Sequence, residues 1–320
     1  MCIDCGPLLD AIERYILKAD EDLESQLEDE GYEHSKETVE SISDIEEQIA
    51  SALQDETDEF LDAIKGAMTM EAFAKEVWPK VKDSDNLADA LREIFDKQFS
   101  SLVPKYADYY INRADPALHV DEVSERTLAW IKTWSQQLGD IMKLNSHEEI
   151  ERLLTASLEK GITVQEFAKS ILDSGIRDEY YKARRAAITE VLRVHNVAQH
   201  EAMMQNAGCK EKEWVHTGAH KNKPRKNHQA MNGQRVAKDA PFELEGIKGG
   251  TYHPMYPRDT SLPPEESINC HCLAREVPDP AILGLSPEER KKLQQEALAQ
   301  MNDDWEKERD EQNKAKAGIA

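Results

Sequence analysis

The stretch from Arg184 to Arg275 is the part of this chain that most restricts what it can fold into. It holds seven of the ten histidines and three of the five cysteines. Asn-Gly, Gly-Gly and Pro-rich segments interrupt its second half, so a long helix cannot run through that half. Elsewhere apolar residues recur every three or four positions, which is the spacing of amphipathic helices. The pattern predicts a helical body that carries a small, loop-rich module.

The composition supports this division. At 320 residues the chain can hold two domains, or one helical body with a compact insert. Charged residues make up 32% of the chain and aromatic residues 6%, which favours long solvated helices over a thick sheet sandwich. We therefore expect an α+β fold with a mainly α-helical body and a small loop-rich α+β module near the C-terminus.

The apolar spacing and the capping residues place the individual elements. Helices are expected at 7–67, 69–78, 86–103, from Ser124 to about 138, at 147–158 after Asn145-Ser146, from the capping box Thr163 to Glu166 onward, at 178–206, and from Ser286 to about Lys307. Strands are expected at 213–217, after the Asn232-Gly233 turn, and at 268–274. The expected domains are an acidic helical body at 1–177, a module with a long leading helix at 178–277, and a C-terminal helix with a polar tail at 278–320.

Charge is distributed unevenly along the chain. The net charge is -23, yet residues 181–275 contain 15 Lys and Arg against 10 Asp and Glu. An acidic body argues against wrapping nucleic acid, because neutralising phosphates requires Lys and Arg. The basic loop with Lys221, Lys223, Arg225 and Lys226 is either a solvated loop or a contact for phosphate or for an acidic partner surface.

Targeting and redox signals are weak. No apolar run is long enough for a transmembrane helix, and the first residues lack the basic flank and apolar core of a signal peptide. Five cysteines do not suggest a disulfide framework, so we expect synthesis in a reducing compartment. Cys2 and Cys5 have CxxC spacing without a βαβ context, which indicates terminal residues or a weak metal site rather than a redox motif.

A metal site is the main chemical prediction for the module. Cys270 and Cys272 flank His271 on an expected strand, where residues two apart point to the same side. Both thiols could therefore face one metal or one apolar core. Zinc favours a tetrahedral set of Cys and His from separate loops, and a module this small gains stability from such a link. The expected zinc ligands are Cys270, Cys272, His228 and His253, with His216 in reserve.

Four segments also carry a family resemblance. They are, in order, "ARRAAITEVLRVHNVAQHEA", "EWVHTG", "PRKNHQAMNGQRVAKDAPF" and "HPMYPRDTSLPPEESINCHC". This series resembles the C-terminal module of phage minor head proteins, the phage Mu F-like head morphogenesis family. The chain departs from the family pattern at Ile188 and His271, where the family more often has Arg. The matching residues are Thr189, Glu190, Trp214, Arg225, His228, Gly233, Phe242, Pro257, Asp259, Asn269, Cys270 and Cys272.

The resemblance implies a minor capsid protein, present in few copies inside the head at the portal vertex. It would act in head morphogenesis and in DNA packaging or delivery, after synthesis in the host cytoplasm. The implied partners are the portal protein and other capsid proteins, with packaged DNA as a further contact of the basic module and with no membrane in the assembled particle. The narrow apolar stripes of the helices lead us to expect an oligomeric or loosely packed protein.

Two other hypotheses about the function remain open on the sequence alone. A metal-dependent nuclease could use His216, His228 and Asp259 as metal ligands, with Arg225 on a phosphate. No complete nuclease or hydrolase motif accompanies them, and 48 residues after Cys272 are too few for the fused toxin-like enzyme that some family members carry. We therefore expect a protein that is not an enzyme. The other reading is a metal-binding adaptor of a cellular host, without a capsid partner.

Overall fold

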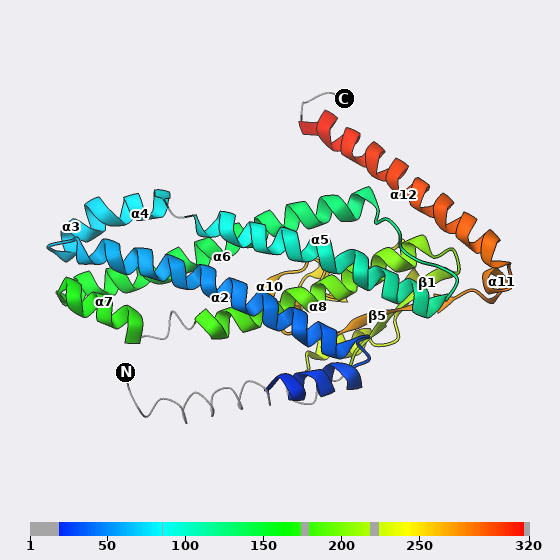
Figure 1. Ribbon diagram of the computed structural model, residues 1–320, viewed down its shortest axis with the longest axis horizontal. Coiled ribbons are helices and arrows are strands. Elements are labelled where there is room, and N and C mark those ends of the chain that lie inside the picture. The colour runs from blue at the N-terminus through cyan, green and yellow to red at the C-terminus, as the bar shows by residue number, and fades with distance from the viewer. Residues whose placement is uncertain (1–18, 85, 174–178, 218–223, 317–320) are drawn as a thin grey trace. The chain divides into compact units, whose positions relative to one another are not determined.

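The computed structural model describes residues 19–84, 86–173, 179–217 and 224–316 (Figure 1). Long helices dominate it, and two small antiparallel sheets lie in the C-terminal part of the chain. The predicted fold class, a mainly α-helical body with a small α+β module, is confirmed. None of the described helices is both long and apolar enough to span a membrane.

The elements are as follows. After a helical segment at residues 19–29, the long helices are α2 (Ser35–Lys65), α5 (Leu87–Ala114), α6 (Glu125–Lys160), α8 (Glu179–Gln205) and α12 (Pro287–Lys316). The shorter helices are α3 (Met70–Ala72), η1 (Phe73–Val77), α4 (Trp78–Ser84), α7 (Val164–Asp173), α9 (Lys226–Met231), α10 (Pro264–Ser267) and α11 (Pro280–Leu283). The strands are β1 (Cys209–Val215), β2 (Arg235–Ala237), β3 (Leu244–Glu245), β4 (Thr251–Tyr252) and β5 (Leu273–Pro278).

The chain forms two compact units from discontinuous segments. Unit 1 consists of Met1–Ser43, Leu102–Thr127 and Ile188–Ala320, and unit 2 of Asp44–Ser101 and Leu128–Ala187. In unit 1 the three segments meet at one side chain. Arg113 donates to Glu33 at 3.1 Å and to both oxygens of Glu276 at 3.1 and 3.2 Å.

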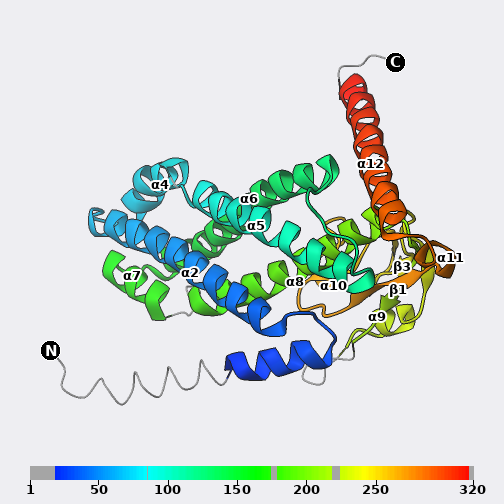
Figure 2. The same ribbon diagram turned by 45° about the vertical axis from the view of Figure 1, so that its right-hand side comes forward.

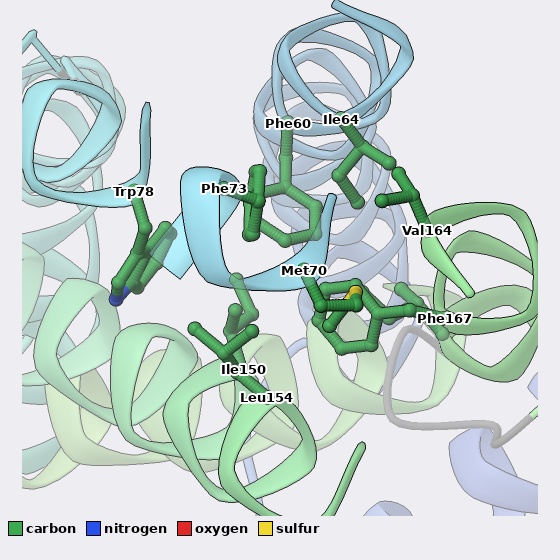
Figure 3. Packing of buried hydrophobic residues seen from close by; sticks show 10 residues of the cluster. Phe60, Ile64, Met70, Phe73, Trp78, Ile150, Leu154, Val164 and Phe167 are labelled. Atoms are coloured by element: carbon green, nitrogen blue, oxygen red, sulfur yellow. The ribbon is translucent and has the colours of Figure 1, made fainter. Parts of the chain in front are cut away.

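Unit 2 is held by a core of aromatic and aliphatic side chains (Figure 3). Phe60 of α2 packs edge-on against Phe73, Trp78 and Phe167, with ring centroids 5.7, 5.5 and 6.4 Å apart. Within α2, α6 and α7 the core residues recur every three or four positions, so those of one helix lie on the same face. Ile64, Met70, Ile150, Leu154, Val164 and Ile171 complete the core.

The predicted capping box at the start of α7 is confirmed. The Thr163 backbone N–H donates to the Glu166 carboxylate at 2.8 Å, and the Glu166 N–H donates to Thr163 Oγ1 at 3.2 Å. The box satisfies two backbone donors that a helix start otherwise leaves without partners. Ser286 and Glu289 make the same pair of hydrogen bonds at the start of α12, where the sequence predicted that a helix begins.

Unit 1 buries a carboxylate at the start of α6. Glu201 of α8 is 2% exposed. It accepts the Ser124 N–H at 2.7 Å, the Ser124 hydroxyl at 2.8 Å, the Thr127 hydroxyl at 2.5 Å and the Gln205 amide at 2.9 Å. The Ser124 hydroxyl in turn accepts the Thr127 N–H, so Ser124 caps the helix as predicted. Four donors satisfy the charge that burial would otherwise penalise.

A buried histidine joins other helices of unit 1. His195 of α8 is fully buried, with Nε2 2.9 Å from Thr38 Oγ1 and Nδ1 2.8 Å from Tyr110 Oη. Its ring stacks on Tyr106 at 3.9 Å. Burial, reinforced by the charge of Arg258, lowers the pKa of His195 to about 3. The imidazole is therefore neutral and structural at neutral pH.

The module contains both sheets. Strand β1 lies between β2 and β5, antiparallel to both, and β3 pairs with β4. Figure 2 shows β1, β3 and α9 gathered in one region of unit 1. Trp214 of β1 is fully buried and packs edge-on against Phe242 at 5.3 Å. The predicted Asn-Gly turn is present, with Gly233 at φ +83 and its N–H donating to the Trp214 carbonyl.

Several predicted helix boundaries are wrong. The expected helix at 7–67 is broken at residues 30–34, where Gly31 and His34 have φ of +84 and +54. Helix α5 continues through Pro104 instead of ending before it. Helix α6 continues through Asn145-Ser146, where the Ser146 hydroxyl donates to the Glu56 carboxylate and caps no helix. Helix α12 extends beyond Lys307 to Lys316.

The elements of the module also differ in detail from those predicted. The expected strand at 268–274 begins at Leu273, so the Cys-His-Cys sequence lies in the loop before β5. The strand expected at 213–217 begins earlier, at Cys209, and ends at Val215. Arg225 precedes a short helix, α9, that was expected to be loop. Cys2, Cys5, Lys221 and Lys223 lie outside the described residues.

Candidate metal centre

Three buried side chains of the module place their ligand atoms together. His228 lies on α9, while Cys270 and Cys272 lie just before β5. Their Nδ1 and Sγ atoms are all within 4.8 Å of one another. His228 Nδ1 is 3.5 Å from Cys270 Sγ and 3.7 Å from Cys272 Sγ. Each of the three residues is at most 3% exposed.

The two remaining histidine candidates lie in different surroundings. His216 directly follows β1, and its Nδ1 is 3.5 Å from Cys272 Sγ. The Asn232 side chain accepts the His216 backbone N–H at 2.8 Å and so holds this position. His253 follows β4 and is exposed. The structure thus places His216 next to Cys272, at the edge of the group formed by His228 and the two thiols, whereas His253 is exposed and in neither contact.

A glutamate orients His228 from the other side of the ring. Glu266 Oε2 lies 2.9 Å from His228 Nε2, and both side chains are almost completely buried. Glu266 also accepts the Ile247 N–H at 2.6 Å and the Asn227 amide at 3.0 Å. With the proton on Nε2, the lone pair of Nδ1 faces the sulfur atoms. This role could not be predicted, because Glu265-Glu266 has the pattern of an acidic first turn of a helix.

The two thiols differ in pKa in opposite directions. The hydrogen bond with Cys272 holds the pKa of Cys270 well below its usual range, and His228 and the charge of Arg258 act in the same direction. The same hydrogen bond, with burial, raises the pKa of Cys272. Arg258 is fully buried and donates to the Leu192 carbonyl and to Tyr32 Oη, each at 3.0 Å. A fixed positive charge therefore favours a thiolate here.

His271, between the two cysteines, makes a different contact. Its Nδ1 lies 2.6 Å from Glu30 Oε2, and its carbonyl accepts hydrogen bonds from Tyr32 at 3.2 Å and Thr217 at 3.0 Å. The side chain at this position therefore joins the Cys-His-Cys loop to the segment that follows residues 19–29. It is a structural contact within unit 1.

Two residues of the nuclease hypothesis, Asp259 and Arg225, make hydrogen bonds that hold loops. The Asp259 carboxylate accepts the backbone N–H groups of Met255 at 2.8 Å and Ser261 at 2.9 Å. Arg225 donates to the Ile268 carbonyl at 2.6 Å. Both side chains thus shape the loops around the cysteines. No observation in the described residues favours the nuclease hypothesis.

Comparisons with known proteins identify the family of the chain. Residues 148–275 match the family of phage Mu protein F-like proteins. YqbB, an uncharacterized protein of Bacillus subtilis (strain 168), is 34% identical over 302 residues, which cover 92% of this chain and 98% of YqbB. No solved structure matches. The chain belongs to the phage Mu F-like family of head morphogenesis proteins, as the ordered motifs predicted.

Proposed function

We propose that the protein is a minor capsid protein, bound inside the phage head at the portal vertex. There it acts in head morphogenesis and in DNA packaging or delivery, after synthesis in the host cytoplasm. The match of residues 148–275 to the phage Mu F-like family carries this proposal. The acidic helices that precede the module add surface for protein contacts rather than chemistry, which fits an assembly role.

The contact with the portal is proposed to lie on α6. Apolar side chains are exposed on this helix within unit 2: Leu128 is 47%, Ile141 45% and Leu144 61% exposed. Ile141 and Leu144 are three residues apart and so share one face of the helix. Exposed apolar side chains grouped on one face mark candidate protein contacts. Other copies of this chain or other capsid proteins are alternative occupants of the same face.

Any contact of the module with DNA is proposed to be weaker than the contact with the portal. Within the described part of the module, Arg225 is engaged with the Ile268 carbonyl, and Arg235 pairs with Glu213 at 2.7 Å. The chain outside residues 181–275 is strongly acidic, which disfavours an extended contact with phosphates. We therefore expect weak binding to duplex DNA that disappears at moderate salt.

The test is co-purification with the portal protein encoded by the same phage, together with mass spectrometry of purified particles. The double variant Ile141→Glu/Leu144→Glu should abolish capture by the portal. Ile247→Glu, which changes a 58% exposed residue of the module, should retain it. Absence of the wild-type protein from both portal and particles would refute the proposed function. Retention of the double variant would refute the α6 contact alone.

A further inference from the structure

We propose that the module binds one structural zinc ion through Cys270, Cys272, His228 and His216. The inference rests on the positions of these side chains and does not depend on the proposed function. It differs from the expectation from the sequence in its fourth ligand, since His216 takes the place of His253.

The distances fit a tetrahedral ion. Zinc binds Cys sulfur at about 2.3 Å and His nitrogen at about 2.0–2.1 Å, so a sulfur and a nitrogen on one tetrahedral zinc lie about 3.6 Å apart. The nitrogen–sulfur distances are 3.5 Å for His228 to Cys270, 3.7 Å for His228 to Cys272 and 3.5 Å for His216 to Cys272. Three of the four nitrogen–sulfur pairs thus have the spacing expected for ligands of one ion, and the ligand atoms of His228, Cys270 and Cys272 all lie within 4.8 Å of one another.

The strand register explains why His216 is the fourth ligand. In the antiparallel pairing of β1 with β5, Val215 lies opposite Leu273. Continuing this register by one residue places His216 opposite Cys272, beside the group formed by the other ligands. His253 is exposed and follows β4, which pairs with β3 in the other sheet.

The surroundings of His228 are those of a metal ligand. A histidine bound to zinc through one nitrogen usually donates its other N–H to a carboxylate or a carbonyl. Glu266 occupies that position for Nε2 and is itself held by the Ile247 N–H and the Asn227 amide. The ring is therefore fixed with Nδ1 toward both sulfur atoms.

The donor set selects the metal. Two thiolates and two imidazoles in a tetrahedral set are typical of structural zinc and leave no open position for a substrate. An ion there would link the end of β1, helix α9 and the loop before β5. The strands of the module have two to seven residues, so such a link would add much to its stability.

An alternative is that Cys270 and Cys272 are merely small residues of the apolar core around Trp214. That alternative accounts for their burial but not for two imidazole nitrogens directed at the sulfur atoms. It predicts that the protein binds no metal tightly and that both thiols react with thiol reagents once the module unfolds. The two alternatives are therefore separable by measurement.

The first test uses the full-length chain purified without chelator. We expect about one zinc per chain by mass spectrometry of metals. After replacement of zinc by Co²⁺, we expect the visible bands of a tetrahedral site and the near-ultraviolet bands of thiolate coordination. A metal-free protein without these Co²⁺ bands would overturn the proposal, and so would an intact mass that shows a disulfide between the cysteines. The wild-type chain suffices, so a variant that fails to fold does not weaken the test.

The second test identifies the fourth ligand with a matched pair of variants. His216→Gln should weaken zinc binding by at least about tenfold and change the Co²⁺ spectrum, whereas His253→Gln should leave both unchanged. Glu266→Gln should weaken binding by about 10- to 100-fold, as expected for a group that orients a ligand. Loss of zinc in His253→Gln, or full retention in His216→Gln, would overturn the assignment of His216.

Discussion

At the scale of single residues, His195 shows how burial sets the behaviour of a titratable group. The ring is enclosed by Thr38, Tyr106 and Tyr110, and burial lowers its pKa from 6.5 to about 3. In the unfolded chain the ring takes up a proton below about pH 6.5. The folded state does not, so folding becomes less favourable as the pH falls from 6.5 toward 3.

This difference gives the first prediction. The free energy of unfolding should fall by about 1 kcal/mol between roughly pH 7.5 and 5.5 because of His195 alone. In His195→Gln, which does not titrate, the total loss over this range should be smaller by that amount. Urea titrations of both proteins at the two pH values measure the difference. Equal losses in the two proteins would contradict the low pKa.

Glu201 gives the second prediction. Glu201→Gln removes the charge and turns an amide donor toward the Ser124 and Thr127 donors. Buried groups left without partners typically cost about 1–3 kcal/mol each, so we expect a loss of roughly 3 kcal/mol in unfolding free energy. Glu288→Gln, at an exposed position of α12, serves as the control and should change it by less than about 0.5 kcal/mol. Similar values for both variants would refute the role of the buried carboxylate.

At the scale of elements, the approach of α5 and α6 within unit 2 depends on a glycine. A Cβ added at Gly139 of α6 would lie 2.5 Å from the carbonyl oxygen of Ala88 on α5. The backbone of α5 therefore occupies the space that any larger side chain would need. A helix interior normally disfavours glycine, so packing rather than helix propensity accounts for this residue.

The third prediction compares two glycines of unit 2. By helix propensity alone Gly139→Ala would stabilise the protein by about 1 kcal/mol. Because the methyl group would collide with the α5 backbone, we expect a destabilisation of roughly 1–3 kcal/mol instead. Gly66→Ala, whose added Cβ would meet no atom closer than 3.6 Å, should be nearly neutral. Thermal unfolding of both variants tests this, and a stabilised Gly139→Ala would rule out the collision.

The elements that the sequence predicted correctly are those set by neighbouring residues. The Thr163 and Ser286 caps form with glutamates three residues away, and the Asn232-Gly233 turn needs only the backbone freedom of glycine. Tertiary contacts decide the other cases. Ser146 donates to Glu56, ninety residues away in the chain, and so does not end a helix. Helix α5 likewise continues through Pro104, whose neighbours Leu102 and Val103 are buried.

The same contrast between local signals and tertiary contacts applies to the residues of the candidate site. Cys270, Cys272 and His228 could be selected from residue type and loop position, without knowledge of the fold. Choosing between His216 and His253 requires the register of β1 against β5, which depends on residues about sixty positions apart. Glu266 could not be recognised, because only the folded loop turns its carboxylate toward His228.

At the scale of the whole molecule, repulsion between like charges opposes the compact state. The net charge is -23, and outside residues 181–275 the chain has 25 Lys and Arg against 53 Asp and Glu. Like charges held together in a compact state repel one another. Salt shortens the range of this repulsion, from a Debye length of about 30 Å at 0.01 M to about 10 Å at 0.1 M.

The fourth prediction follows from this repulsion. The Tm should rise by several degrees when NaCl is increased from about 0.01 to 0.1 M, because screening relieves the repulsion. Scanning calorimetry measures the shift, and a neutral solute at the same osmolality is the control. A Tm that falls with added NaCl would mean that the ion pairs of the native state outweigh the repulsion.

The discontinuous make-up of unit 1 has a consequence for synthesis on the ribosome. Every residue of unit 2 has been translated once position 187 is reached, whereas unit 1 also needs Ile188 and the residues after it. Glu30 must wait for His271, and Arg113 for Glu276, before their contacts can form. Unit 2 can therefore fold on the nascent chain, while the early residues of unit 1 remain without their native neighbours during much of translation.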